Sequence, residues 1–221
     1  MTKQELAKRI DHTLLKPDAT AEQIKALCAE AVENGFGAVC VNSGRAALAK
    51  ECLAGTDVKL CVVVGFPLGC SVAKAAEAKV MADLGAQEID MVLDVGRAKD
   101  GDWEAVEADI QAVRNACPDQ TLKVILETCL LTEPEIVRAC QAAKNTGADF
   151  VKTSTGFSAG GAKAHDVALM KQSAGGIPVK ASGGIRTWAD AKAMLEAGAD
   201  RIGASAGIAI LKGWEESTWE T

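Results

Sequence analysis

Several residue types that often carry protein function are scarce in this chain of 221 residues. It has no tyrosine, its only histidines are His12 and His165, and none of its eight cysteines belongs to a C-x-x-C pair. Zinc and iron sites are built largely from clustered histidine and cysteine ligands. We therefore expect no metal centre and no mechanism that depends on one.

Long apolar runs are missing as well. Residues 1–15 carry charges throughout, and no later run approaches the roughly 20 apolar residues of a membrane helix. No export signal is evident, and the cysteines are scattered over mostly apolar segments, which favours buried free thiols over disulfides. We expect a soluble protein of the cytoplasm.

Acidic residues outnumber basic ones, and the formal net charge is −6. A protein with this overall charge repels nucleic acid and anionic membranes. We expect neither as a partner, so an anionic ligand would have to be held by a local site.

Two lysines stand at matching points of two similar segments. Lys152 lies in V-K-T-S-T-G, residues 151–156, and Lys180 lies in V-K-A-S-G-G, residues 179–184. A lysine amine is a nucleophile only when neutral, and its ordinary pKa of about 10.4 leaves well under roughly 0.1% neutral at pH 7. A second cation nearby depresses that pKa. If the two segments are neighbouring strands, one lysine can form a Schiff base while the other activates it.

A glycine signature that occurs four times predicts the fold. It precedes an apolar run at Gly35, Gly85, Gly147 and Gly198, at intervals of 50, 62 and 51 residues. One strand-plus-helix unit needs about 25 to 30 residues, so each interval holds two units. The signatures then precede the even-numbered strands of eight, which predicts a single (β/α)8 TIM barrel, an α/β fold, over residues 1–221.

Local patterns agree with that count. Thr20, Asp102, Thr132 and Thr187 have the sequence context of helix N-caps, and Gly35 closes the helix that starts after Thr20. Short apolar runs suit strands buried on both faces of a parallel sheet. They span residues 10–14, 37–41, 60–64, 89–95, 122–126, 150–152, 178–181 and 201–203.

An open, doubly wound sheet would give a similar pattern over about six strands, and periodicity alone does not separate the two folds. No strand is followed by a complete G-x-G-x-x-G turn, however, which counts against a dinucleotide-binding sheet. The barrel is therefore the favoured fold.

Two glycine-rich turns follow the last two expected strands. They are G-G-I-R at residues 183–186 and G-A-S-A-G at residues 203–207. Backbone N–H groups at a helix start attract phosphate, and barrels commonly place a phosphate site in these two loops. One such turn is more often ordinary turn geometry. The paired placement favours a phosphate site.

Asp90 lies in the middle of the apolar run of the expected fourth strand. A buried carboxylate is costly unless a cation or hydrogen bonds compensate. Asp90 either tethers a loop or pairs with an arginine at the barrel rim, or it carries protons opposite the lysines. Spacing alone favours neither interpretation.

The chain resembles the deoxyribose-phosphate aldolases, a family of class I aldolases. The matching segments follow the family's order from residue 10 to about residue 212, which is nearly the whole chain, and the two lysine segments are the most specific of them. They are I-D-H-T-L-L-K-P (10–17), V-C-V-N (39–42), V-G-F-P-L-G (64–69), E-I-D-M-V (88–92), K-V-I-L-E-T (123–128), V-K-T-S-T-G-F-S (151–158), V-K-A-S-G-G-I-R (179–186) and R-I-G-A-S (201–205).

The resemblance implies a lyase that reversibly cleaves 2-deoxy-D-ribose 5-phosphate into acetaldehyde and D-glyceraldehyde 3-phosphate without a cofactor. It implies that Lys152 forms the imine, that Lys180 keeps the Lys152 amine neutral, and that Asp90 moves protons together with an ordered water. A homo-oligomer, with a dimer favoured, is also expected. The implied phosphate contacts are Gly156, Gly183, Gly184, Gly203 and Ser205.

The chain departs from the family pattern in two places. Ala206 stands where relatives often have a second serine, so one hydroxyl contact to phosphate is lost while the backbone N–H remains. Many relatives also end in a tail whose terminal tyrosine assists proton transfer at C2. Here the expected tail, residues 213–221, ends in Trp-Glu-Thr. We expect slower proton exchange at C2 than in relatives with that tyrosine.

Other polar residues have blander interpretations. We interpret Cys40 as a small buried hydrophobe and both histidines as structural, while Asp11 either orients charged groups at the barrel mouth or anchors the first strand. Arg186 either touches phosphate or lies on the rim.

Two other functions remain open at this stage: another class I aldolase of transaldolase type, and a sugar-phosphate-binding barrel without catalysis. The presence of Lys152, Lys180 and Asp90 argues against the second, because a binder has no need of a neutral amine in its pocket.

Overall fold

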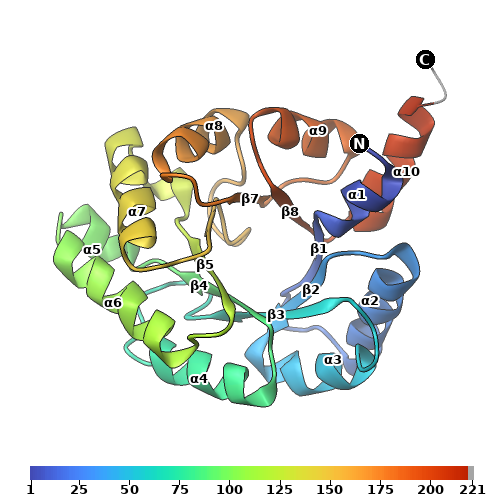
Figure 1. The fold of residues 1–221 in the computed structure, drawn as a ribbon, viewed down its shortest axis with the longest axis horizontal. Coiled ribbons are helices and arrows are strands. Elements are labelled where there is room, and N and C mark those ends of the chain that lie inside the picture. Colours follow the sequence, from blue (N-terminus) through green and yellow to red (C-terminus); the bar gives the residue numbers. More distant parts are fainter. Residues whose placement is uncertain (219–221) are drawn as a thin grey trace.

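Eight parallel strands close into a barrel in the computed structural model, which describes residues 1–218 (Figure 1). Each strand pairs with the next one along the chain, and β8 pairs with β1 to complete the closure. This arrangement confirms the predicted (β/α)8 barrel. The strands are β1 (Ile10–Leu14), β2 (Ala38–Asn42), β3 (Lys59–Val64), β4 (Glu88–Val92), β5 (Thr121–Ile125), β6 (Phe150–Lys152), β7 (Val179–Ser182) and β8 (Arg201–Ala204).

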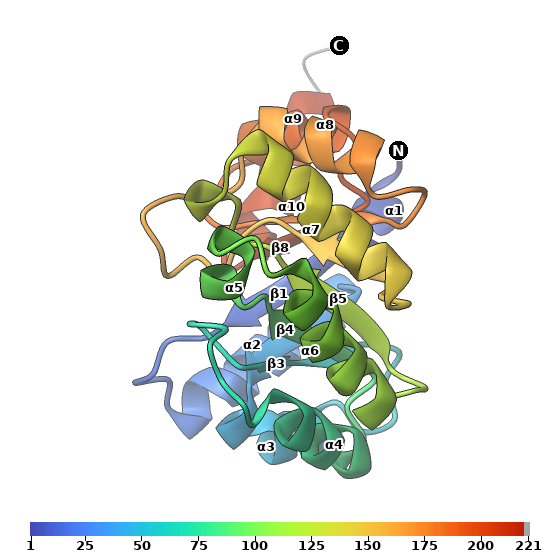
Figure 2. The same ribbon diagram turned by 90° about the vertical axis from the view of Figure 1, so that its left-hand side faces the viewer.

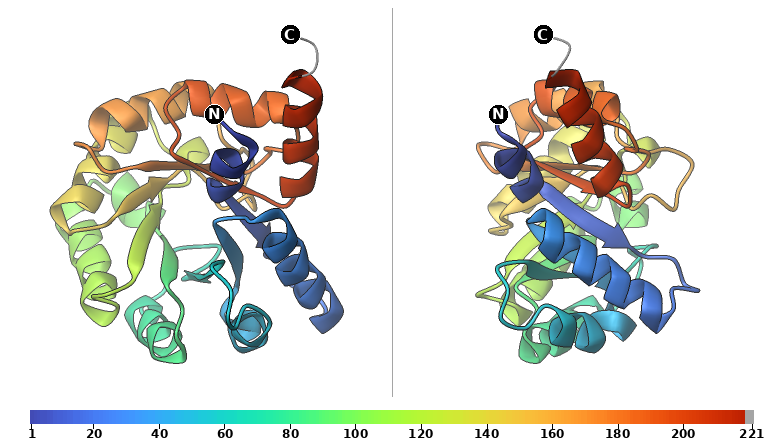
Figure 3. Two further views of the ribbon diagram at one scale, coloured as in Figure 1. Left: turned by 45° about the vertical axis from the view of Figure 1, so that its right-hand side comes forward. Right: turned by 90° about the vertical axis from the view of Figure 1, so that its right-hand side faces the viewer.

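Helices form the outer layer around the strands (Figures 1 and 2). The helices at the two ends of the described chain, α1 and α10, pack side by side, so both ends lie on one side of the barrel (Figure 3). The helices are α1 (Lys3–Lys8), α2 (Ala21–Asn34), α3 (Ala46–Cys52), α4 (Lys74–Leu84), α5 (Val95–Lys99), α6 (Trp103–Ala116), α7 (Glu133–Asn145), α8 (Ala164–Ser173), α9 (Trp188–Glu196) and α10 (Gly207–Thr218), with short 3-10 helices η1 (Ser43–Arg45) and η2 (Thr128–Leu130).

The predicted helix caps are confirmed. Thr20, Thr132 and Thr187 each form a capping box at the start of α2, α7 and α9, and the side chain of Asp102 accepts a hydrogen bond from the third residue of α6. Gly35 ends α2 with a φ of +67°, a left-handed conformation that favours glycine. These caps set where each helix begins, and hence how long each strand-to-helix loop is.

One predicted strand was too long. The run at residues 89–95 was expected to be a strand throughout, but β4 ends at Val92. Asp94 is the N-cap of α5, and its side chain accepts a hydrogen bond from the backbone N–H of Arg97. The apolar pattern itself does not show where the strand ends. Asp94, as a typical helix N-cap residue, does indicate that a helix begins there.

The segment expected as a tail is helical as far as it is described. Residues 213–218 are the last part of α10, where Trp214 packs against the main hydrophobic core and Lys3 Nζ lies 2.7 Å from Glu215 Oε1. Residues 219–221 lie outside the described part of the chain.

The main apolar core lies between the strands and the helices. Inside the barrel, a small apolar cluster around Cys40, Cys61 and Val63 occupies the β2–β3 side, and several buried charged residues lie beside it. All eight cysteines are free thiols. Among the residues that the structure describes, no helix is both long and apolar enough to cross a membrane.

Candidate active site

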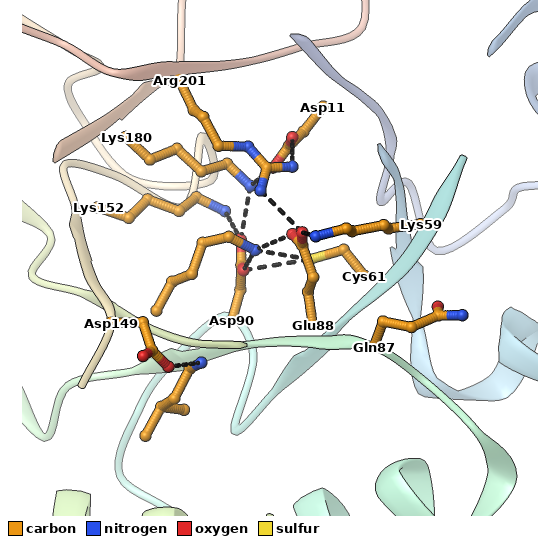
Figure 4. A network of polar contacts seen from close by, with 12 residues as sticks. Asp11, Lys59, Cys61, Gln87, Glu88, Asp90, Asp149, Lys152, Lys180 and Arg201 are labelled. Carbon is orange, nitrogen blue, oxygen red and sulfur yellow. Dashed lines mark hydrogen bonds and ion pairs between the residues drawn. The ribbon is translucent and has the colours of Figure 1, made fainter. Parts of the chain in front are cut away.

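Lys152 and Lys180 lie directly opposite each other on neighbouring strands. They are register partners in the β6–β7 pair, which confirms that the two lysine segments are adjacent. Both side chains are buried, and both ammonium groups donate to the same oxygen of Asp90, with Nζ to Oδ2 distances of 2.9 Å from Lys152 and 2.8 Å from Lys180 (Figure 4). Two cations therefore share one buried carboxylate oxygen.

Side-chain hydrogen bonds hold the ends of these two strands in register. The hydroxyl of Thr153 donates to the carbonyl of Ser182 and accepts from its N–H, both at 3.0 Å. The hydroxyl of Ser182 donates to the carbonyl of Ser154 at 2.6 Å. The small polar residues that follow each lysine thus fasten β6 to β7 at the level of the amines.

Asp90 faces the barrel interior from β4, across from the lysines, and not the rim. Burial alone would raise the pKa of this carboxyl, but Lys123, Lys152 and Lys180 outweigh it and hold the pKa well below its usual range. Asp90 is therefore ionised. The structure supports the position required for proton transfer and excludes the alternative of an arginine tether at the rim.

Three charged residues that the sequence reasoning did not assign also belong to this site. Lys123 Nζ lies 2.7 Å from Asp90 Oδ1 and 2.6 Å from Glu88 Oε2, and Arg201 Nη1 lies 2.8 Å from Glu88 Oε1. Each is a charged residue within a strand that is otherwise largely apolar, which is the signal that pointed to Asp90. That signal marks them as candidates, but it does not show whether their side chains point into the barrel.

Asp11 lies deep in the barrel and not at its mouth. Its Oδ2 is 2.5 Å from Lys180 Nζ, and its Oδ1 accepts a hydrogen bond from Arg201. Burial opposes ionisation of Asp11, but Lys180 and Arg201 lower its pKa to about 2. In the same way, burial disfavours the Lys180 cation, while Asp11 and Asp90 raise the pKa of Lys180 above its usual range. Lys180 is therefore a permanent cation beside Lys152.

A cavity of about 310 Å³ opens above Lys152. Its lining includes the loops after β6, β7 and β8 and the loop after β1. Arg186 and Lys16 are among the lining residues. Gly156, Gly183 and Gly184 have φ values of +84°, +90° and +79°, which only glycine adopts easily. All five residues predicted to contact phosphate line this cavity: Gly156, Gly183, Gly184, Gly203 and Ser205.

Two groups of potential metal ligands lie in the interior, which the sequence did not predict. Donor atoms of Cys40, Cys61 and Asp90 lie within 4.8 Å of one another, as do those of Asp11, Cys61 and Glu88. The ammonium groups that surround these carboxylates would repel a further cation. Burial also raises the pKa of Cys61, so its thiol stays neutral and donates to Asp90 Oδ1 at 3.1 Å.

Both histidines lie outside the cavity lining. His12 Nε2 is 2.7 Å from Glu30 Oε2, and the His12 ring packs against Phe36. His165 Nε2 is 2.8 Å from Glu133 Oε1 on the surface. These contacts agree with the structural roles expected for both.

Comparisons with known proteins agree with one another. A family model described as DeoC/LacD family aldolase matches residues 6–213. A deoxyribose-phosphate aldolase of Mannheimia succiniciproducens is 56% identical over 221 residues, 99% of each chain, and one of Clostridium perfringens is 54% identical over 96% of this chain and 97% of the relative.

Solved structures give the same result. An aldolase designated QR15 superposes with a TM-score of 0.91 at 40% identity, covering 97% of this chain and 98% of the other. A deoxyribose phosphate aldolase from Aeropyrum pernix, described as having a unique tetrameric structure, has a TM-score of 0.92 at 34% identity over 98% of this chain and 93% of that one.

Proposed function

The chain belongs to the DeoC/LacD family of aldolases, and from this premise we propose that it reversibly cleaves 2-deoxy-D-ribose 5-phosphate into acetaldehyde and D-glyceraldehyde 3-phosphate. It is an enzyme of the lyase class. The observation that carries the proposed mechanism is the pair of buried lysines, Lys152 and Lys180, on one oxygen of Asp90, with Lys152 also lining the cavity.

Lys152 is the proposed nucleophile because it lines the cavity, whereas Lys180 does not. Its neutral amine attacks the carbonyl carbon of the open-chain sugar, and loss of water from the carbinolamine leaves an iminium ion. Lys180 is held as a cation by Asp11 and Asp90. Its charge opposes a second charge on the Lys152 amine, and Asp90 with an ordered water carries the protons that the addition and dehydration steps require.

The carbon–carbon bond breaks once the iminium ion is in place. The C3 hydroxyl loses its proton, the bond between C2 and C3 breaks, and its electron pair flows into the iminium group to give an enamine and D-glyceraldehyde 3-phosphate. Protonation of the enamine at C2 and hydrolysis then release acetaldehyde and restore the Lys152 amine. Because the iminium group is itself the electron sink, we propose that no cofactor takes part.

The phosphate end of the substrate is proposed to bind at the glycine-rich rim. Backbone N–H groups around Gly156, Gly183, Gly184 and Gly203 and the hydroxyl of Ser205 line the cavity on the side of the loops after β6, β7 and β8. The loop after β8 leads into the start of α10, whose first N–H groups favour an anion. Arg186 lines the same cavity and adds a positive charge.

Borohydride trapping tests the mechanism. The protein is incubated with 2-deoxyribose 5-phosphate, reduced, digested and analysed by mass spectrometry, and a single adduct on Lys152 is expected. Lys152→Leu abolishes the adduct, and Lys180→Leu lowers its rate by about a hundredfold or more. Lys171→Leu, which removes an exposed lysine, keeps it. An unmodified Lys152 in folded wild-type protein contradicts the proposal.

We propose further that the chain forms a homo-oligomer, with a dimer favoured, and works in the cytoplasm. The tetrameric description of the Aeropyrum pernix relative supports self-association. The eight free thiols suit a reducing compartment. Light scattering that gives the mass of one chain at micromolar concentration contradicts the first proposal.

A further inference from the structure

Six buried or nearly buried side chains form a closed ring of alternating charge inside the barrel (Figure 4). Three carboxylates alternate with three cations, so the ring is neutral as a whole. Its members, in order around the ring, are Asp11, Lys180, Asp90, Lys123, Glu88 and Arg201.

Each cation of the ring bridges two carboxylates. Lys180 Nζ is 2.5 Å from Asp11 and 2.8 Å from Asp90, and Lys123 Nζ is 2.7 Å from Asp90 and 2.6 Å from Glu88. Arg201 closes the ring between Glu88 and Asp11. The carboxylates and both lysines have fully buried side chains, and that of Arg201 is 13% exposed. These charges are weakly screened by water, so their balance matters.

Lys152 lies outside this ring. Its Nζ contacts one ring member, Asp90, at 2.9 Å, and within the described residues no other carboxylate pairs with it. Asp90 already has ion pairs with Lys123 and Lys180. The interior thus holds four basic side chains for three carboxylates, and Lys152 is the one left over.

We propose that Lys123 and Arg201 are positioning residues for the reaction: they complete the neutral ring and so leave Lys152 as the surplus cation, the one that gives up its proton. The inference rests on the proposed role of Lys152 as the Schiff-base nucleophile. It differs from a two-lysine scheme, in which Lys180 alone activates Lys152 and the charge of Lys123, on the far side of Asp90, has no effect.

The protonation of the ring members supports this division. Burial disfavours the Lys123 cation, but Asp90, Cys61 and Glu88 together raise its pKa well above its usual range. Burial likewise opposes the Arg201 cation, and Asp11 and Glu88 raise its pKa. Both shifts favour the charged form of these residues. Lys152, by contrast, shares Asp90 with two other cations and has no second carboxylate partner among the described residues.

Every strand contributes a titratable group to this interior. Besides the ring and Lys152, these are the thiols of Cys40 on β2 and Cys61 on β3. The half-exposed Lys59 of β3 also reaches Glu88 Oε1, at 3.8 Å, and is unchanged in the variants below. Burial raises the pKa of Cys61, and the neighbouring Cys61 side chain lowers the pKa of Cys40. Both thiols are unchanged in the variants described below, so they do not cause a difference between the pH profiles of those variants.

The test is the pH profile of kcat/KM for two variants that unbalance the ring in opposite directions. Lys123→Met removes a positive charge, so Asp90 holds the Lys152 proton more tightly and the acid limb shifts up by about one pH unit. Glu88→Gln is nearly isosteric and removes a negative charge, so the acid limb shifts down by about the same amount. Lys123→Arg keeps the charge and is expected to restore the wild-type limb.

Lys74→Met is the matched control for loss of a buried lysine. Lys74 is 2% exposed and pairs with Asp109 at 2.5 Å, but on the outer side of the barrel. Its loss destabilises the fold and leaves the acid limb in place. Opposite shifts in Lys123→Met and Glu88→Gln, with none in Lys74→Met, support the proposal, because simple destabilisation gives no sign dependence.

Shifts of the two variants in the same direction, or no shift in either, overturn the proposal. If Lys123→Met does not fold, Glu88→Gln alone decides: a downward shift supports the ring, and an upward shift or none overturns it. Failure of the proposed function is recognised separately, since it appears in the wild type as absent cleavage and an untrapped Lys152.

Discussion

Gly203 lies where any side chain would press on the Lys180 amine. A Cβ at this position would lie 3.0 Å from Lys180 Cε and 3.0 Å from Ser182 Cβ, closer than packed carbon atoms normally approach. We predict that Gly203→Ala displaces Lys180 from Asp90, lowers kcat by about tenfold to a hundredfold, and costs about 1–3 kcal/mol of unfolding free energy. Steady-state kinetics and urea denaturation measure the two effects.

Gly44→Ala is the control for the extra methyl group. Nothing lies within 4 Å of a Cβ at Gly44, and its φ is not positive, so this change is expected to leave both kcat and stability nearly unchanged. A Gly203→Ala variant with wild-type kcat would mean that the position of Lys180 is not critical.

At the level of single residues, motif context predicted more than burial did. The lysines and phosphate-loop glycines stood in specific segments. The structure places the glycines and Lys152 around one cavity, with Lys180 on the same Asp90 oxygen as Lys152. For Lys123 and Arg201, the surrounding sequence did not indicate which residue would form an ion pair with each. A charged residue in an apolar strand looks the same in sequence whether it points into the barrel or out. The partners of Arg201, Asp11 and Glu88, also come from strands far away along the chain.

At the level of elements, the pairing of β6 with β7 depends on one hydroxyl. Thr153 Oγ1 accepts from the N–H of Ser182 and donates to its carbonyl. We predict that Thr153→Val, which keeps the shape, leaves a buried N–H without an acceptor and costs about 1–3 kcal/mol. Because Lys152 and Lys180 stand beside this contact, kcat should also fall. Chemical denaturation and single-turnover kinetics are the measurements.

Thr56→Val provides the comparison, since the Thr56 hydroxyl also donates to a carbonyl and accepts from an N–H, but in the loop before β3. Its loss is expected to affect stability slightly and kcat not at all. An equal loss of kcat in both variants would refute the link between the β6–β7 contact and the amines.

Because residues 213–218 belong to helix α10, a truncation that removes them is expected to affect stability. Truncation after Lys212 removes Trp214 from the core contact and Glu215 from its pair with Lys3, so it should lower the unfolding free energy by about 1–3 kcal/mol.

A shorter truncation after Thr218 removes no tyrosine, since the chain has none, and should leave turnover within about twofold of the wild type. Deuterium exchange at C2 of acetaldehyde measures the relevant step, and a sharp loss there in the shorter truncation would disprove this.

Element ends were the least predictable part of the fold. The caps at Thr20, Asp102, Thr132 and Thr187 could be predicted from the sequence. A capping side-chain oxygen and the backbone N–H that it accepts from are only three residues apart in the chain. The end of β4 depends instead on where pairing with β5 stops, at Val92 and Ile125, which is a property of the closed barrel.

At the scale of the whole molecule, the barrel was predictable because it is a repeat. Four glycine signatures precede β2, β4, β6 and β8, one for every second strand. Their number therefore predicted eight strands without any knowledge of how the strands pair. The charged interior was not predictable in the same way. Barrel interiors are usually filled by branched apolar residues, and four of the six ion pairs of the ring join strands that are not consecutive along the chain.

The ring also sets how stability depends on pH. Asp11 has a folded pKa of about 2, below its ordinary value of 3.8, because Lys180 and Arg201 outweigh the effect of burial. The pKa values of Glu88 and Asp90 are lowered as well, mainly by Lys123 acting against burial. A carboxyl with a depressed pKa contributes stability that is fully present above its unfolded pKa and is lost as pH falls through the folded value.

The cations act at the other end of the pH range. Asp90 and Asp11 raise the pKa values of Lys123 and Lys180 above the ordinary value of 10.5. Their contribution is fully present below that ordinary value and is lost as pH rises through the folded one. The ring therefore stabilises the fold fully between about pH 4.5 and about pH 10.5.

We predict that the unfolding free energy from urea titrations falls steeply between about pH 4.5 and pH 2. Asp11→Asn removes one charge from the ring, so it should lower the neutral plateau by about 3–5 kcal/mol and make the acid limb shallower. Asp83→Asn, which removes an exposed carboxylate paired with Lys79, should leave the curve unchanged within about 1 kcal/mol. If Asp11→Asn retained the full acid dependence, other carboxylates would be responsible for it, and the ring would not be the main source of acid sensitivity.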